Sequence, residues 1–111
     1  MRVWYFVRDL DAGRSFYTGK LGFTETYVDN DDRWAKLERG GMQIALAEGE
    51  PADDGGVATI DVEDVKAEGE RLRGEQVEVG TVLELHGEVR LLDVFDPDGN
   101  RLQLVEDVSG R

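Results

Sequence analysis

The chain has 111 residues, with 13 Lys and Arg against 25 Asp and Glu, and a formal net charge of −12 at pH 7 when the single histidine is neutral. This length predicts one structural domain, and 40% hydrophobic with 34% charged residues is typical of a folded globular protein. The lack of cysteine excludes disulfide scaffolds and cysteine nucleophiles, and one histidine excludes a site that needs two per chain.

The charge and the hydropathy pattern also indicate where the protein acts. Nucleic acid is disfavoured as a partner, because affinity for phosphates comes from Lys and Arg. The longest stretch without a charged side chain is Gly40–Ala47, far shorter than the roughly 20 residues of a membrane helix. The segment Met1–Trp4 lacks the apolar run of a signal peptide. We therefore predict a cytoplasmic protein without a membrane partner.

The first half of the chain predicts a strand, a helix and three more strands. Val3–Val7 is β-branched and aromatic, as strands are. Asp9 or Asp11 is a candidate N-cap for a helix over about Ala12–Gly19. The three later strands are predicted from Leu21-Gly22-Phe23 to about Val28, over Trp34–Glu38 and over Met42–Ala47, the last two forming a hairpin around Gly40-Gly41.

The second half predicts the same order of elements. A strand at Val57–Val62 is followed by a helix that starts at Glu63 or Asp64 and ends near Arg73. Further strands are expected from Val77 to Leu85, over Val89–Phe95 and over Arg101–Val105.

The two halves also align residue by residue. Asp9 aligns with Asp64 at an offset of 55, and Glu48 aligns with Glu106 at an offset of 58. One βαβββ unit leaves a sheet face uncovered, so two units are expected to pair. We predict modules over residues 1–48 and 56–111, joined by a linker over 49–55, within one structural domain.

Three segments then resemble one protein family. They are Val7–Leu10 followed by Ser15–Phe23, the strand Ala58–Asp64, and Asp96–Glu106 with its D-P-D-G-N turn. They are similar to motifs of the vicinal oxygen chelate superfamily, which holds glyoxalases, bleomycin resistance proteins and extradiol dioxygenases. The resemblance implies an α+β fold in which two βαβββ modules form a curled mixed sheet around a central cavity, usually in a homodimer. Asp9, Phe16, Tyr17, Gly22, Asp96, Pro97 and Gly99 have structural roles as caps, packing residues and turn residues in this interpretation.

Enzymes of the superfamily hold a divalent ion with His, Glu or Gln from four strands. Counting within the motifs places these positions at Arg2, Ala45, Val57 and Gln103. A guanidinium has no lone pair to donate, and alanine and valine have no donor atoms, so Gln103 alone offers a neutral oxygen. A metal site needs about three protein ligands. We therefore predict no metal, no cofactor and no catalytic residue.

Strand alternation identifies the side chains that would line the cavity instead, because every second residue faces the same way. The predicted set is rich in aromatic rings, with a few charges and one loop histidine. The predicted ligand-binding residues are Arg2, Trp4, Phe6, Trp34, Lys36, Val57, Asp61, His86, Phe95 and Gln103.

Three functions are compatible with this pattern. The missing metal ligands favour a metal-free protein of the bleomycin resistance type that sequesters an aromatic, cationic compound such as an antibiotic. The alternative is a glyoxalase- or dioxygenase-like lyase, isomerase or oxygenase, with His86 or Asp61 as acid–base. The third is a protein that keeps the fold for assembly or regulation. The charge of the ligand stays open, because the net charge attracts a cation while Arg2, Lys36 and Arg101 share the inward parity and favour a carboxylate.

Overall fold

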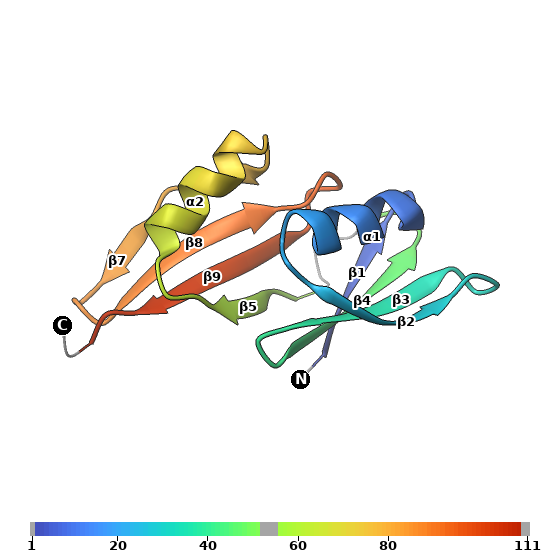
Figure 1. The fold of residues 1–111 in the computed structure, drawn as a ribbon, viewed down its shortest axis with the longest axis horizontal. Coiled ribbons are helices and arrows are strands. Elements are labelled where there is room, and N and C mark those ends of the chain that lie inside the picture. The colour runs from blue at the N-terminus through green and yellow to red at the C-terminus, as the bar shows by residue number, and fades with distance from the viewer. Residues whose placement is uncertain (1, 52–55, 110–111) are drawn as a thin grey trace.

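The computed structural model describes residues 2–51 and 56–109, and Arg2 by its backbone only (Figure 1). Residue 1, residues 52–55 of the predicted linker and residues 110–111 lie outside the described chain. The first half contains β1 (Arg2–Val7), α1 (Leu10–Gly19), β2 (Thr24–Asp29), β3 (Trp34–Arg39) and β4 (Met42–Glu48). The second half contains β5 (Ala58–Asp61), α2 (Val65–Gly74), β6 (Glu78–Val79), β7 (Leu83–Leu85), β8 (Val89–Phe95) and β9 (Arg101–Asp107).

The strands form two mixed sheets. The first sheet has the order β1-β4-β3-β2, and the second has the order β5-β9-β8-β6, with β7 also paired to β8. In each module the strand that comes first in the chain pairs in parallel with the strand that comes last, as β1 does with β4 and β5 with β9. The α+β fold of two repeated units is therefore confirmed, while the ends of the units, 48 and 56, stay a prediction.

The two sheets lie end to end in a molecule of 48 × 27 × 24 Å, and α1 and α2 lie on the same side of it (Figure 1). In the described chain the sheets do not close into a barrel around a shared cavity. Each sheet instead keeps one helix-free face, meaning the face opposite its own helix. Neither described helix is long and apolar enough to cross a membrane.

Each helix begins with the same pair of contacts. Asp9 and Asp64 are the N-caps, and their side chains accept hydrogen bonds from Ala12 N and Ala67 N. This settles the choice between Asp9 and Asp11 and between Glu63 and Asp64. A glutamate from the last strand of each module then accepts the first helical N–H: Leu10 N donates to Glu48 at 3.0 Å and Val65 N donates to Glu106 at 2.9 Å. The aligned glutamates therefore satisfy backbone donors that a helix cannot pair internally.

The helix-facing side of each sheet forms the core. In β1 the predicted alternation is confirmed, since Val3, Tyr5 and Val7 are buried while Trp4 and Phe6 are exposed. Two glycines allow the helices to approach closely. A Cβ on Gly13 would lie 3.1 Å from Val7, and one on Gly69 would lie 2.9 Å from Leu92.

The predicted strand from Val77 to Leu85 is wrong, because the structure divides it into β6 and β7. Val79 pairs with Val94 and Leu83 pairs with Leu91. From Val79 to Leu83 the chain advances four residues, while its partner β8 advances only three, from Leu91 to Val94. One extra residue therefore interrupts the ladder. The predicted strand at Val57–Val62 is also shorter, since β5 covers only Ala58–Asp61.

Polar side chains join the two modules. The Tyr5 hydroxyl donates to Arg101 O at 2.5 Å and accepts from Ala58 N at 2.9 Å. The Tyr17 hydroxyl donates to Asp96 at 2.8 Å. Burial and the adjacent Asp96 charge raise the pKa of Tyr17 well above its ordinary value, so this hydroxyl stays a donor at neutral pH.

Candidate functional site

The helix-free face of the first sheet carries a group of aromatic side chains. The ring centroids of Trp4 and Trp34 lie 5.6 Å apart, and those of Tyr27 and Trp34 lie 5.1 Å apart. The Lys36 ammonium lies 5.5 Å from the Trp34 ring centroid and 5.7 Å from that of Tyr27. We call Trp4, Tyr27, Trp34 and Lys36 the aromatic cluster.

Strand pairing explains why these residues meet. Lys36 pairs with Tyr27 on one side and with Ala45 on the other, and Ala45 pairs with Trp4. The small Ala45 leaves room for the larger side chains on either side of it, Trp4 and Lys36, and it is itself completely buried. The cluster is still accessible, because Trp4 is 43% and Tyr27 is 46% exposed. Aromatic rings in such contact offer faces and edges on which a flat ligand can stack.

Tyr27 is the cluster member that sequence reasoning missed. The pairing register shifts between Glu25 and Tyr27, which marks a β-bulge. A bulge inserts one residue and reverses the alternation beyond it. Thr24 and Tyr27 consequently share a face, although an unbroken strand would put them on opposite faces. The aromatic ring of Tyr27 made it a candidate for the cluster, but nothing in the sequence locates the bulge that turns it to this face.

The predicted site residues divide between the two sheets. Trp4, Phe6, Trp34 and Lys36 lie on the helix-free face of the first sheet, and Phe6 is 42% exposed there. Arg2 belongs to β1, but its side chain is outside the described part of the chain. The helix-free face of the second sheet carries Asp61, Phe95 and Gln103. In the described chain, no hydrogen bond, ion pair or ring contact joins the two predicted sets.

The helix-free face of the second sheet is polar at one end and apolar at the other. Asp93 accepts from Arg101 at 3.3 Å and from Gln103 at 3.2 Å, so the Arg101 charge has a partner within the chain. Leu83 and Leu85 lie at the other end and are 57% and 42% exposed.

The remaining predicted residues lie apart from the aromatic cluster. Val57 is half-buried just before β5. His86 is exposed in the turn between β7 and β8, with a positive φ of 55°. Phe95 lines an open pocket of about 420 Å³ with Phe16 and the Asp96–Gly99 turn. This pocket opens beside the module junction, away from the helix-free face of the first sheet.

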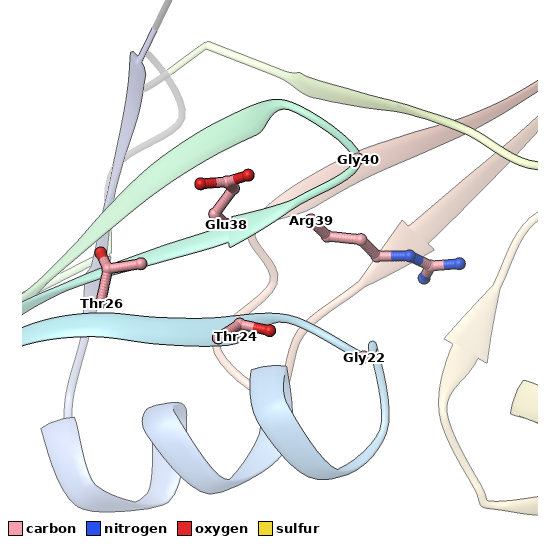
Figure 2. Close-up of a pocket in the computed structure, with 6 residues that line it drawn as sticks. All are labelled: Gly22, Thr24, Thr26, Glu38, Arg39 and Gly40. Carbon is pink, nitrogen blue, oxygen red and sulfur yellow. The ribbon is translucent and has the colours of Figure 1, made fainter.

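A second open pocket, of about 310 Å³, lies at the edge of the first sheet between Gly22 and Gly40 (Figure 2). Arg39 lines it, but its guanidinium already donates to Leu21 O and to Glu68, each at 2.7 Å. Glycines and threonines form most of the remaining wall, so this pocket offers little to recognise a ligand.

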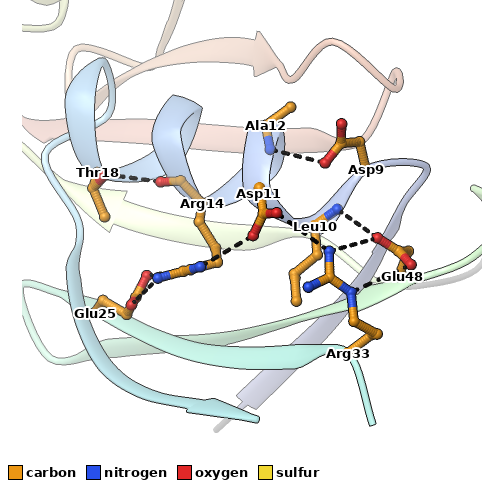
Figure 3. A network of polar contacts seen from close by, with 9 residues as sticks. All are labelled: Asp9, Leu10, Asp11, Ala12, Arg14, Thr18, Glu25, Arg33 and Glu48. Carbon is orange, nitrogen blue, oxygen red and sulfur yellow. Dashed lines mark hydrogen bonds and ion pairs between the residues drawn. The ribbon is translucent and has the colours of Figure 1, made fainter. Parts of the chain in front are cut away.

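A network of polar contacts surrounds α1 and has a structural role. Arg33 lies between Glu48 and Asp11, and Arg14 bonds Glu25 with two nitrogens (Figure 3). Hydrogen bonds from Arg33 and from Leu10 N lower the pKa of Glu48. The ion pairs of these carboxylates hold the helix and the strands together.

The four positions where relatives would hold a metal do not fit one. Ala45 presents a buried methyl group and Val57 an aliphatic side chain. The Gln103 amide is bonded to Asp93, and that carboxylate also pairs with Arg101. Among residues 2–51 and 56–109, no group of three or more His, Asp or Glu side chains could hold a metal ion. The donor set thus offers one amide where a divalent ion needs about three ligands.

A sequence profile decides the family. The profile of the Glyoxalase/Bleomycin resistance protein/Dioxygenase superfamily matches residues 2–104. The chain belongs to this superfamily. The resemblance inferred from the sequence motifs is therefore confirmed, whereas a comparison with curated proteins found no match.

Several solved structures share the fold of this chain. An integron cassette protein from the mobile metagenome of the Halifax Harbour sewage outfall is 23% identical, with a TM-score of 0.83 over 96% of both chains. The fosfomycin resistance protein FosX from Listeria monocytogenes, in complex with Mn(II) and sulfate, is 18% identical, with a TM-score of 0.79 over 98% of this chain and 90% of that one. Lactoylglutathione lyase from Agrobacterium tumefaciens is 18% identical, with a TM-score of 0.77 over 96% and 91%. At these identities the likeness concerns the fold alone.

Proposed function

We propose that this superfamily member is a metal-free, cytoplasmic small-molecule-binding protein that stacks a planar aromatic ligand on the aromatic cluster. The observation that carries the proposal is the exposed contact of Trp4, Tyr27 and Trp34 on a helix-free face. The unsuitable residues at the four metal positions support binding over metal-assisted chemistry. An antibiotic with a flat ring system is one class of compound that would suit such a surface.

We also propose that the protein works as a homodimer. The exposed large apolar side chains, Trp4, Phe6, Tyr27, Leu83 and Leu85, all lie on the helix-free faces of the two sheets. Apolar groups gathered on uncovered faces favour association. A second copy facing these sheets would enclose the ligand between the two chains, which one copy alone does not do.

Sedimentation should show a dimer of the 12.4 kDa chain at micromolar concentration, with about 1,600 Å² buried in total. Leu83→Glu places a charge on the apolar end of the second sheet and should weaken the dimer at least about tenfold, or ~1.4 kcal/mol. Ala67→Glu adds the same charge to exposed α2 and is the matched control. A monomeric wild type, or equal weakening by both variants, would contradict the proposed dimer.

The stacking proposal predicts that Trp34→Ala weakens binding of a flat neutral probe. Calorimetric titration with 2-naphthalenemethanol should show roughly a tenfold loss, because ring stacking contributes about 1–3 kcal/mol. Trp34→Phe keeps a ring and should lose much less. The indole N–H signals of Trp4 and Trp34 should shift on titration, which places the probe on the cluster. Unchanged affinity in both Trp34→Ala and Trp4→Ala would refute stacking.

A further inference from the structure

The charge of the aromatic cluster comes from one side chain. Lys36 lies in the middle of β3, half-buried, with its ammonium held against the rings of Trp34 and Tyr27. Each ring centroid is within the roughly 6 Å at which a cation is attracted to an aromatic face. The position that a ligand's cation would take against these two rings is thus already taken by Lys36.

Lys36 differs from the arginines in its partners. Seven arginines form ion pairs with carboxylates: Arg8, Arg14, Arg33, Arg39, Arg71, Arg90 and Arg101. None of the ion pairs within 4.0 Å that the described residues form includes Lys36. Lys20, Lys66 and Arg73 also form none of these pairs, but Lys36 is the one of the four that lies against the rings of the aromatic cluster.

The acidic side chains that share the face do not neutralise Lys36 by contact. Asp29 accepts hydrogen bonds from Asp31 N and Asp32 N, each at 3.0 Å, and so serves its own turn. Glu38 lies two residues further along β3, where it pairs with Gln43 and Thr24. On the second sheet, Arg101 is paired with Asp93. Lys36 is therefore the described cation of the helix-free faces that keeps its charge available.

We infer that the aromatic cluster selects a planar ligand that carries an anionic group, such as an aromatic carboxylate. The ring would stack on the tryptophans, and the anion would pair with Lys36 in surroundings drier than bulk water, where an ion pair is stronger. A cationic ligand would have to displace the ammonium or lie beside it. This inference rests on the proposed function and chooses between the two ligand charges that the sequence leaves open.

The test compares three probes that share one ring system. Calorimetric titration at low salt would use 2-naphthoate, neutral 2-naphthalenemethanol and cationic 2-naphthylmethylammonium. The wild type should bind the carboxylate about three- to tenfold more tightly than the alcohol, as expected for one partly exposed ion pair. Lys36→Met keeps most of the aliphatic stem and should abolish this ratio. Lys66→Met removes the same charge from exposed α2 and should leave the ratio unchanged.

The readout is the ratio of two affinities, so a general loss of binding in Lys36→Met does not imitate the expected result. Equal or tighter binding of the ammonium probe, or a ratio that survives Lys36→Met, would overturn the inference and leave the stacking proposal intact. Failure of all three probes to bind would refute the proposed function, and the inference with it. Indole signals that respond to protein concentration but to none of the probes would assign this face to a second copy alone. That result would overturn both the inference and the stacking proposal.

Discussion

Asp96→Ala is expected to lower the free energy of unfolding by about 3–5 kcal/mol, because it leaves several buried hydrogen-bond donors without an acceptor. The Asp96 carboxylate is 4% exposed. It accepts hydrogen bonds from Asp98 N at 2.9 Å, Asn100 N at 2.8 Å and the Tyr17 hydroxyl at 2.8 Å. Alanine would leave these groups unpaired and would loosen both the turn and the contact with α1.

Urea unfolding at pH 7 measures this effect, and Asp98→Ala is its control. Asp98 lies two residues away, and its side chain, which is 14% exposed, pairs at 3.0 Å with Arg8, which is 62% exposed. In the described chain Asp98 accepts only from Arg8, whose exposed guanidinium and N–H water can reach once the carboxylate is gone, so the control should lose far less than Asp96→Ala. Similar losses in the two variants would show that Asp96 does not hold the junction together.

Glu106→Ala is expected to cost about 2–4 kcal/mol, because a buried helix N–H loses a charged acceptor. Glu106 is 1% exposed and accepts from Val65 N, the first residue of α2. Its other oxygen lies 3.5 Å from Arg90. Removing the carboxylate would leave the start of α2 without this acceptor in a place that water reaches poorly.

The internal repeat supplies the matched control, Glu48→Ala. Glu48 makes the same contact to Leu10 N, but its side chain is 34% exposed. Water can replace the lost acceptor there, so the cost should stay near the ~1 kcal/mol of an ordinary hydrogen bond. Unfolding midpoints in urea would compare the two variants. A larger loss in Glu48→Ala than in Glu106→Ala would contradict the role of burial.

The local signals in the sequence predicted most of the fold. Asp9 and Asp64 are helix caps, and the D-P-D-G-N turn at Asp96 has the expected bonds from its own backbone. Gly99 has a φ of +85°, which the turn requires and which other residues rarely adopt. These features depend on side chains close in sequence, and for that reason they could be read without the structure.

The interruptions of the strands could not be predicted in the same way. The bulge before Tyr27 and the extra residue between Val79 and Leu83 both depend on the register with a neighbouring strand. The alternation of side chains identifies the face of a residue only where the pairing between neighbouring strands is unbroken. The aromatic cluster was therefore predicted without Tyr27, although Trp4, Trp34 and Lys36 were placed on the correct face.

Which charged side chains of the site are paired could not be predicted from the sequence either. Lys36 and Arg101 share the inward parity, yet Arg101 pairs with Asp93 while Lys36 lies against rings. Which cation finds a carboxylate depends on side chains that only the folded chain brings together. The unsuitable metal positions, in contrast, could be recognised early, because alanine and valine lack donor atoms in any conformation.

The junction at Tyr5 has a consequence for how relatives of this protein can diverge. No described strand of one sheet pairs with a strand of the other, and the Tyr5 hydroxyl joins the two sheets through Ala58 N and Arg101 O. A ladder would fix the angle between the sheets through many backbone bonds, whereas here a small number of side chains fixes it, among them Tyr5, Tyr17 and Arg39. Substitutions at these side chains can change the angle between the sheets without breaking a strand pairing within either sheet. Evolution can thus widen or narrow the space between the faces without rebuilding either half.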